Sequence, residues 1–261
     1  MATTTPPCCL RIPFTWDGTP TGTVATIPGT GHPTYVTAHT NPRAAVLLIH
    51  DLVGWTFPNL RLLADHYARE IDATVYVPDF FGGVVLPFAP ILENRFADLG
   101  DLTAFWQANN RHAREPEIVA VARALRATYP KLGAVGFCYG GWAVFRLGAR
   151  EFNDGGERLV DAVSAAHPTF LTKGDIDGVG VPVQLLAPER DAAYTDELKL
   201  YTFSVLLGRK DVSFDYQHMA GVEHGCLSRG DEREEGERDA MVRGKDAAVS
   251  WMRHWLHVQG A

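Results

Sequence analysis

The first regular pattern along the chain begins after Arg43. Residues 44–49 form a short uninterrupted apolar run, which is typical of a strand buried on both faces of a parallel sheet. Residues 59–70 then place apolar side chains at helical spacing, and residues 73–77 return to a β-branched strand. This succession predicts a βαβ unit.

The rest of the chain repeats this alternation of strands and helices. Further strands are predicted at residues 132–137, 162–166, 181–187 and 212–216. Helices are predicted at residues 116–129, 140–150, 196–207 and 238–257, the first of them with Pro116 in its opening turn. The pattern therefore predicts an α/β fold with a mostly parallel central sheet and helices on both of its faces.

Two stretches depart from this alternation. Short alternating pieces at residues 22–27 and 34–38 predict an edge hairpin within an N-terminal extension, about 8–40. Residues 82–114 mix prolines, aromatic residues and isolated charges, which indicates an excursion over the top of the sheet that forms one wall of a pocket. We interpret residues 1–261 as a single domain with these two additions.

Composition and charge exclude several partners. The 261 residues are 46% hydrophobic and 21% charged, with a formal net charge of −7 and no basic stretch, so nucleic acid is not expected as a partner. No apolar run approaches the roughly 18 residues that span a bilayer, and the first residues lack the features of a secretory leader. We expect a soluble, cytoplasmic protein without a membrane partner.

The four cysteines are too few for a disulfide scaffold. Cys8 and Cys9 are sequence neighbours, which rarely bridge each other, and we expect all four cysteines to be thiols. No HExxH or CxxC spacing is present, so neither a metal nor another cofactor is expected.

The sharpest local signal surrounds Cys138. The run Gly136-Phe137-Cys138-Tyr139-Gly140-Gly141 lies between a predicted strand and a predicted helix, where a G-x-S-x-G nucleophile elbow would lie, with cysteine in place of serine. Small neighbours let strand and helix pack closely enough to raise the central side chain above the sheet. The helix N-terminus favours a thiolate at Cys138. A buried cysteine at an ordinary strand–helix turn is the alternative interpretation.

Two downstream residues complete a catalytic arrangement. His224 follows the last predicted strand and precedes the last helix, which is the expected place of a general base, although a lone loop histidine is often merely solvated. Asp191 follows the strand before it and would orient His224, with Glu189 and Asp196 as close competitors. The order of nucleophile, acid and base is the one used by hydrolases of this strand–turn–helix type.

These motifs resemble the dienelactone hydrolases. The resemblance is carried by GFCYGG, PERD and GVEHG, and its fungal-type branch is indicated by CCLRIPFTWDGTPTG, LLIHDLVGW and PDFFGG. It runs over nearly the whole chain. It implies an α/β-hydrolase fold and a Cys-His-Asp triad, here Cys138, His224 and Asp191, which opens lactones through an acyl-thioester without a cofactor.

The resemblance also implies supporting groups around the nucleophile. Asp51 stands where family members carry an acid beside the nucleophile, and its alternative role is to cap the following turn. The backbone N–H groups of Tyr139 and Leu52 would form the oxyanion hole. Arg229 stands where family members carry an arginine that contacts the substrate carboxylate, and an exposed surface arginine is the alternative.

Several further side chains are candidates for the pocket. An aromatic wall is predicted from four residues, although core packing is an alternative for each: Phe81, Trp106, Trp142 and Tyr194. His167, at the end of a predicted strand, would line the pocket or fix its loop. Cys226 lacks an elbow and is expected to be a packing residue.

The leading hypothesis is a cysteine-dependent hydrolase of a small lactone or ester. One alternative keeps the site and changes the reaction to isomerisation or cyclisation without net hydrolysis. A non-catalytic ligand-binding relative is a further alternative, for which an intact Cys, His and Asp set would be a coincidence. The pattern does not distinguish a monomer from a homodimer.

Overall fold

A computed structural model describes residues 14–38, 43–152 and 157–258, so Cys8 and Cys9 lie outside the described residues. Its strands are β1 (Thr23–Thr26), β2 (Pro33–Thr37), β3 (Ala44–Ile49), β4 (Thr74–Pro78), β5 (Lys131–Phe137), β6 (Ala162–Ala166), β7 (Val183–Arg190) and β8 (Phe214–Glu223). They form one eight-stranded sheet in the order β1-β2-β4-β3-β5-β6-β7-β8.

Helices follow most of the strands. The longer ones are α1 (Pro58–Ile71), α3 (Leu102–Ala108), α4 (Arg111–Thr128), α5 (Gly140–Leu147), α7 (Asp196–Leu206) and α9 (Glu235–Arg253). The shorter ones are α2 (Phe88–Leu92), η2 (Phe96–Leu99), η3 (Arg150–Phe152), α6 (Lys173–Gly178), α8 (Cys226–Arg229) and η4 (His254–Val258). In these residues no helix has both the length and the apolar character needed to cross a membrane.

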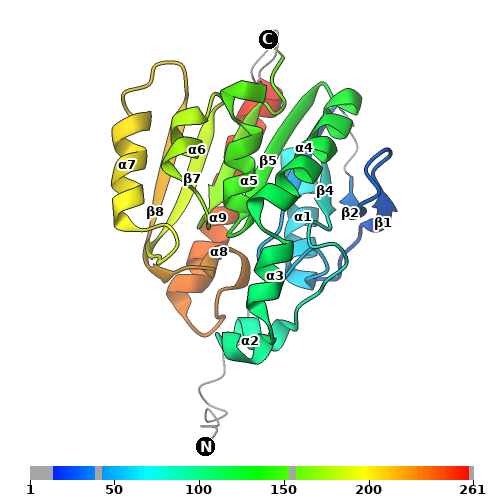
Figure 1. The fold of residues 1–261 in the computed structure, drawn as a ribbon, viewed down its shortest axis with the longest axis vertical. Coiled ribbons are helices and arrows are strands. Elements are labelled where there is room, and N and C mark those ends of the chain that lie inside the picture. Colours follow the sequence, from blue (N-terminus) through cyan, green and yellow to red (C-terminus); the bar gives the residue numbers. More distant parts are fainter. Residues whose placement is uncertain (1–13, 39–42, 153–156, 259–261) are drawn as a thin grey trace, which may run out of the picture.

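The sheet confirms the predicted fold class. Strands β4, β3, β5, β6, β7 and β8 pair in parallel, and β1 and β2 add an antiparallel hairpin at the β4 edge. Helices α4, α5 and α6 lie in front of the sheet in Figure 1, and α1 and α9 lie behind it. Both faces are thus covered, and all six residues of β3 are buried, as its uninterrupted apolar sequence requires.

Helix α4 differs from the expectation. It begins at Arg111 and not at Pro116, because Asn110 caps it, its side chain accepting a hydrogen bond from the N–H of Ala113 at 3.0 Å. Pro116 therefore lies inside the helix, where its ring removes one N–H donor. The preceding excursion is also more regular than expected, since α2, η2 and α3 form within it.

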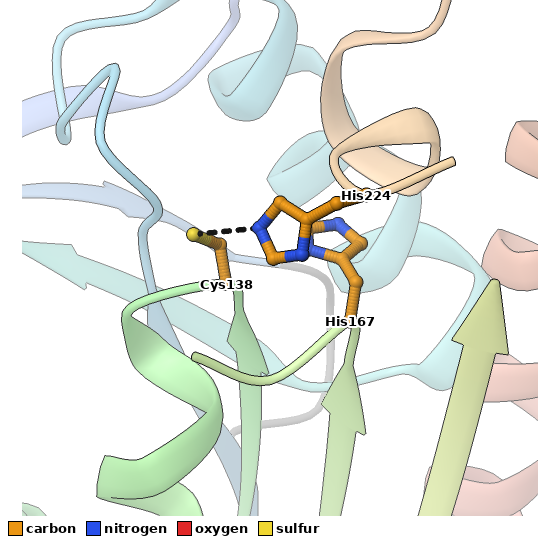
Figure 2. A group of neighbouring side chains, drawn as sticks. All are labelled: Cys138, His167 and His224. Carbon is orange, nitrogen blue, oxygen red and sulfur yellow. Dashed lines mark hydrogen bonds between the residues drawn. The ribbon is translucent and has the colours of Figure 1, made fainter. Parts of the chain in front are cut away.

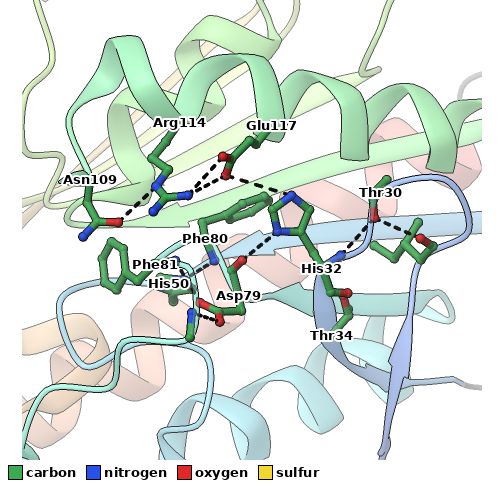
Figure 3. Close-up of polar contacts among 12 residues, drawn as sticks. Thr30, His32, Thr34, His50, Asp79, Phe80, Phe81, Asn109, Arg114 and Glu117 are labelled. Atoms are coloured by element: carbon green, nitrogen blue, oxygen red, sulfur yellow. Dashed lines mark hydrogen bonds and ion pairs between the residues drawn. The ribbon is translucent and has the colours of Figure 1, made fainter.

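The loops after β3 and β4 are fastened to each other at the end of the sheet where the parallel strands terminate (Figure 3). The backbone N–H of Phe80 donates to His50 Nε2 at 3.2 Å, so His50 Nδ1 carries the hydrogen and donates to the carbonyl of Asp51 at 2.9 Å. The Asp79 carboxylate accepts from the N–H groups of Phe81 and Gly83. This network holds the two loops that border the nucleophile.

Strands β7 and β8 are longer than the sequence pattern predicts. They extend to Arg190 and Glu223, which are paired across the sheet, with a register shift between Pro188 and Arg190. Asp191 and His224 are the next residues along the chain. The two adjacent strands therefore deliver an acid and a histidine to the same point at the sheet edge.

Candidate active site

Cys138 occupies a sharp turn between β5 and α5. Its φ of 48° lies in the left-handed region, which a residue with a side chain rarely adopts. The turn is possible because a Cβ on Gly136 would approach the carbonyl oxygen of Gly140 to 2.2 Å, and one on Gly140 would approach the oxygen of Ile49 to 2.3 Å. The glycines of the motif therefore allow the close packing that sets Cys138 at the end of the sheet.

Three side chains converge at this turn from three strand ends. His224 Nε2 lies 3.1 Å from Cys138 Sγ, as Figure 2 shows, and His224 Nδ1 lies 2.9 Å from both carboxylate oxygens of Asp191. Because a carboxylate only accepts, Nδ1 carries a hydrogen, which leaves Nε2 directed at the sulfur. The arrangement has the geometry of a nucleophile, a base and an orienting acid.

The electrostatics of this trio favour a protonated His224. Burial alone lowers the pKa of His224, but the neighbouring Cys138 sulfur and the hydrogen bonds of His224 with Asp191 and Cys138 outweigh it and raise this pKa to about 10. Burial raises the pKa of Asp191, but the hydrogen bond and charge of His224 reverse the effect and hold it below its usual value. A protonated His224 places a positive charge 3.1 Å from the Cys138 sulfur.

The structure separates Asp191 from its two competitors. The Asp191 side chain has no exposed surface and accepts from the N–H groups of Ala193 and Tyr194 in addition to His224. Glu189 instead accepts from the N–H of Gly221 at 2.6 Å, and Asp196 pairs with Lys199 while 89% of its side chain is exposed. Only Asp191 reaches His224 among these three.

Thr169 is a neighbour of the nucleophile that sequence reasoning missed. Its hydroxyl lies 3.2 Å from Cys138 Sγ and 3.4 Å from His224 Nε2. Its backbone N–H also donates to the carbonyl of Cys138 at 2.8 Å. Its position three residues beyond β6, at the sheet edge that carries the elbow, was the only available signal.

His167 lies beside His224 and near Cys138 (Figure 2). Its side chain is fully buried, and its ring packs edge-on against that of His224 at a centroid distance of 4.9 Å. Burial, with the charges of His224 and Arg229, holds the pKa of His167 well below its usual value, so the ring is neutral. Neither ring nitrogen hydrogen-bonds to another described group.

Asp51 contacts its own turn and α8, and no hydrogen bond joins it to the Cys138 sulfur. Its carboxylate accepts from the N–H of Val53 at 3.0 Å and the hydroxyl of Ser228 at 2.7 Å, and it lies 3.4 Å from Nε of Arg229. Arg229 is buried and not surface-exposed, contrary to one of the two alternatives weighed for it. The acid therefore both caps its turn and pairs with the arginine.

The two backbone N–H groups expected at an oxyanion hole belong to the turn at the nucleophile and to the loop after the neighbouring strand β3. Tyr139 follows Cys138 directly and precedes the first residue of α5, and Leu52 lies in the turn that Asp51 caps. The Tyr139 side chain is fixed by its hydroxyl, which donates to the carbonyl of Asn109 at 2.8 Å.

Two cavities flank the site. One cavity has a volume of about 390 Å³, and Phe96 forms part of its wall. Most of its other lining residues are charged or polar: Asn94, Arg190, Asp191, Glu223, His224 and Arg229. The other, of about 340 Å³, is more apolar and is lined by Trp106, Asn110, Arg111, His112 and Phe170. Trp106 also stacks on Tyr139, the residue after the nucleophile, at a centroid distance of 6.0 Å.

The other expected aromatic residues lie deeper. Phe81 is buried and packs edge-on against Tyr139 at 5.0 Å. Trp142 and Tyr194 have no exposed surface, and the hydroxyl of Tyr194 donates to Thr202 at 2.9 Å. These positions favour packing roles for Trp142 and Tyr194. Cys226 is a free, buried thiol whose pKa is raised by burial.

Sequence comparisons relate this chain to known proteins. The sequence model of the dienelactone hydrolase family matches residues 33–256. The chain is 27% identical to Hydrolase tropI of Talaromyces stipitatus over 95% of this chain and 96% of that protein. It is 37% identical to the carboxymethylenebutenolidase homolog of Mus musculus over 71% of each chain.

Solved structures share the fold. The dienelactone hydrolase from Anabaena variabilis superposes with a TM-score of 0.64 at 16% identity, covering 94% of this chain and 99% of that one. The esterase Est2 of Thermogutta terrifontis superposes with a TM-score of 0.61 at 12% identity, covering 92% and 97%. The match of the family model over most of the sequence means that this chain belongs to the dienelactone hydrolase family.

Proposed function

We propose that this chain hydrolyses a small lactone or ester through an acyl-thioester on Cys138. The observation that carries the proposal is the single hydrogen-bonded line from Asp191 through His224 to Cys138 Sγ, with contacts of 2.9 and 3.1 Å. The relatives named as hydrolases and carboxymethylenebutenolidase homologs support ester or lactone chemistry. Cytoplasmic location remains part of this proposal.

The first half of the reaction uses the resting thiolate. Cys138 Sγ attacks the carbonyl carbon, and the N–H groups of Tyr139 and Leu52 hold the resulting oxyanion. Collapse of this intermediate breaks the bond to the alcohol or enol oxygen, which takes the proton from His224 Nε2. The products of this half are an acyl-thioester and a free or ring-opened hydroxyl group.

The second half returns the enzyme to its starting state. Neutral His224 removes a proton from water, the hydroxide attacks the thioester carbonyl, and collapse releases the acid and the Cys138 thiolate. Asp191 holds the ring in one tautomer and stabilises its protonated form throughout. A thiolate is also a good leaving group, so the site suits activated acyl groups such as enol lactones better than amides.

The polar cavity indicates where the acid part of a substrate would lie. Arg229 and Arg190 line it beside His224, whereas Asp191 is already engaged by the histidine. Arg229 is our candidate for contact with an anionic substituent of the substrate. Its ion pair with Asp51 would be kept when the substrate binds. The apolar cavity beside Trp106 is our candidate for the ring or alkyl part of the substrate.

A screen of lactones and aryl esters with intact-mass detection tests this proposal. We expect an acyl adduct on Cys138, a product heavier than the substrate by one water, and loss of turnover in Cys138→Ala with the fold retained. Cys226→Ala is the matched control and should keep its activity, because this thiol is buried and does not stand at an elbow. Cys138→Ser should turn over much more slowly than the parent.

Each alternative predicts a different outcome in the same screen. Product without a mass gain would indicate isomerisation or cyclisation at the same site. Tight binding without adduct or turnover would indicate a non-catalytic relative. Full activity of Cys138→Ala would remove the nucleophile assignment.

A further inference from the structure

His167 is a buried polar side chain that the hydrolytic mechanism does not use. It has no exposed surface, and both ring nitrogens are without a hydrogen-bond partner among the described residues. Buried imidazoles in native proteins almost always find a partner, because an unpaired polar group away from water is costly. An unpaired imidazole at this place therefore points to a ligand that the hydrolytic triad alone does not explain.

The surroundings of His167 supply two further metal-binding atoms. One ring nitrogen of His167, one of His224 and the sulfur of Cys138 all lie within 4.8 Å of one another (Figure 2). The three residues stand at or just beyond the ends of β5, β6 and β8. They are thus held on a rigid sheet edge and not on one flexible loop.

We propose that this trio is a binding site for Zn²⁺, and that the bound ion shuts off the nucleophile. Zn²⁺ prefers thiolate and imidazole ligands, at about 2.3 Å for sulfur and about 2.0–2.1 Å for nitrogen. At the tetrahedral angle these lengths set neighbouring ligand atoms about 3.3–3.6 Å apart. The 3.1 Å between Cys138 Sγ and His224 Nε2 would therefore widen slightly, and His167 would move inward from within 4.8 Å of the other two atoms. Water or the Thr169 hydroxyl completes a fourth position.

The outer shell also suits a cation. Asp191 accepts from the far nitrogen of His224, which is the carboxylate–histidine arrangement that orients zinc-bound imidazoles. Asp191 and the Cys138 thiolate together balance the two positive charges of the ion. The cationic Arg229, which also acts on His167, is paired with Asp51.

Zinc binding would act on both catalytic atoms at once. The ion takes the sulfur lone pair and replaces the proton at His224 Nε2, so neither thiolate attack nor proton transfer remains. The proton from His224 leaves to the solvent, no other covalent bond in the protein breaks, and a chelator reverses the block. The inhibitory consequence rests on the proposed function, whereas the binding itself does not.

Direct metal titration tests the site independently of turnover. We expect isothermal titration of the full chain with ZnSO₄ to give one ion per chain, and Co²⁺ to give a thiolate-to-metal charge-transfer band. Zinc-edge X-ray absorption of the loaded parent should show one sulfur and two imidazole ligands. Loss of a residue that only supports a metal ligand typically weakens metal binding by roughly 10–100-fold. His167→Gln removes a ligand itself, so it should weaken Zn²⁺ binding by at least this factor. Cys226→Ala should bind as the parent does.

The outcomes separate this inference from the proposed function. One imidazole in the absorption spectrum, or parent-like affinity in a folded His167→Gln, would overturn the role of His167. Absence of zinc binding in a chain that forms the acyl adduct would overturn the site while leaving the hydrolase proposal intact. Binding with three protein ligands in a chain without esterase activity would support the site and refute only its inhibitory role. The spectroscopic test on the parent stands even if His167→Gln does not fold.

Discussion

His224 lies between two partners that are distant in sequence: Nε2 is 3.1 Å from the sulfur of Cys138, 86 residues earlier, and Nδ1 is 2.9 Å from both oxygens of Asp191. Both ring nitrogens are therefore engaged. The ring has no freedom to turn without losing one of these contacts, and the proton transfers of the proposed reaction run along one line. The predictions below test this line and its surroundings.

Replacing the orienting acid should slow the reaction strongly. Asp191→Asn presents an amide in place of the carboxylate, which removes the charge and no longer fixes the tautomer of His224. We expect kcat to fall by roughly 10²–10⁴-fold, the range found for such changes in related triads. Steady-state kinetics on an aryl ester measure it. Glu189→Gln is the control and should stay near the parent.

The Thr169 hydroxyl should matter for the thiolate. It is 3.2 Å from Cys138 Sγ and can donate to the ionised sulfur. Thr169→Val keeps the shape and removes this donor, which for a charged acceptor is worth about 1.5–3 kcal/mol, or roughly 10–100-fold in acylation rate. Pre-steady-state acylation measures the change. Thr128→Val, on an exposed helix end, should have no such effect, and an unchanged Thr169→Val would argue against a role for the hydroxyl.

The protonation of His224 should depend on its sulfur neighbour. In the parent its pKa is raised from 6.5 to about 10. The raised pKa means that protonated His224 stabilises the folded state. This contribution to the free energy of unfolding is fully present below pH 6.5 and is lost as the pH rises through about 10. Cys138→Ala removes the thiolate, so the pKa should fall. A pH series of histidine ¹³C–¹H NMR spectra follows it directly, and identical titration curves for parent and variant would contradict the ion pair.

The buried pair of Asp51 and Arg229 should stabilise the fold only as a pair. Arg229→Met leaves the Asp51 charge buried without its partner and should lower the free energy of unfolding by about 3–5 kcal/mol. Adding Asp51→Asn should recover part of this loss, because the unpaired charge is then gone. Urea denaturation measures both variants. Arg243→Met, from an exposed ion pair, should change stability by less than about 1 kcal/mol.

Local patterns in the sequence were enough for most of the sheet. The strands at residues 44–49 and 162–166 match their predicted bounds, because every residue in them is buried and apolar or small. The start of α4 was misplaced because Pro116 was taken as its first turn, whereas Asn110 provides the stronger cap. Asn110 and Pro116 each indicate the start of a helix, but at positions several residues apart, so the sequence alone leaves the start of this helix open.

The candidate site was predictable only where a motif marks it. Cys138, Asp191 and His224 each follow a strand, so their convergence was expected from chain order alone. The contact of Thr169 with Cys138 and the burial of His167 behind His224 depend on how neighbouring strand ends pack. No local pattern encodes such packing, since the partners are 31 or more residues apart.

The parallel order of β5, β6, β7 and β8 has a consequence for synthesis of the chain. The nucleophile is made first, while its acid and base are carried by the last two strands to enter the sheet. A ribosome-bound chain that has emerged only as far as residue 190 would expose a thiol that lacks both its orienting acid and its catalytic base. Reactivity of Cys138 toward an ester therefore reports that the whole sheet has assembled.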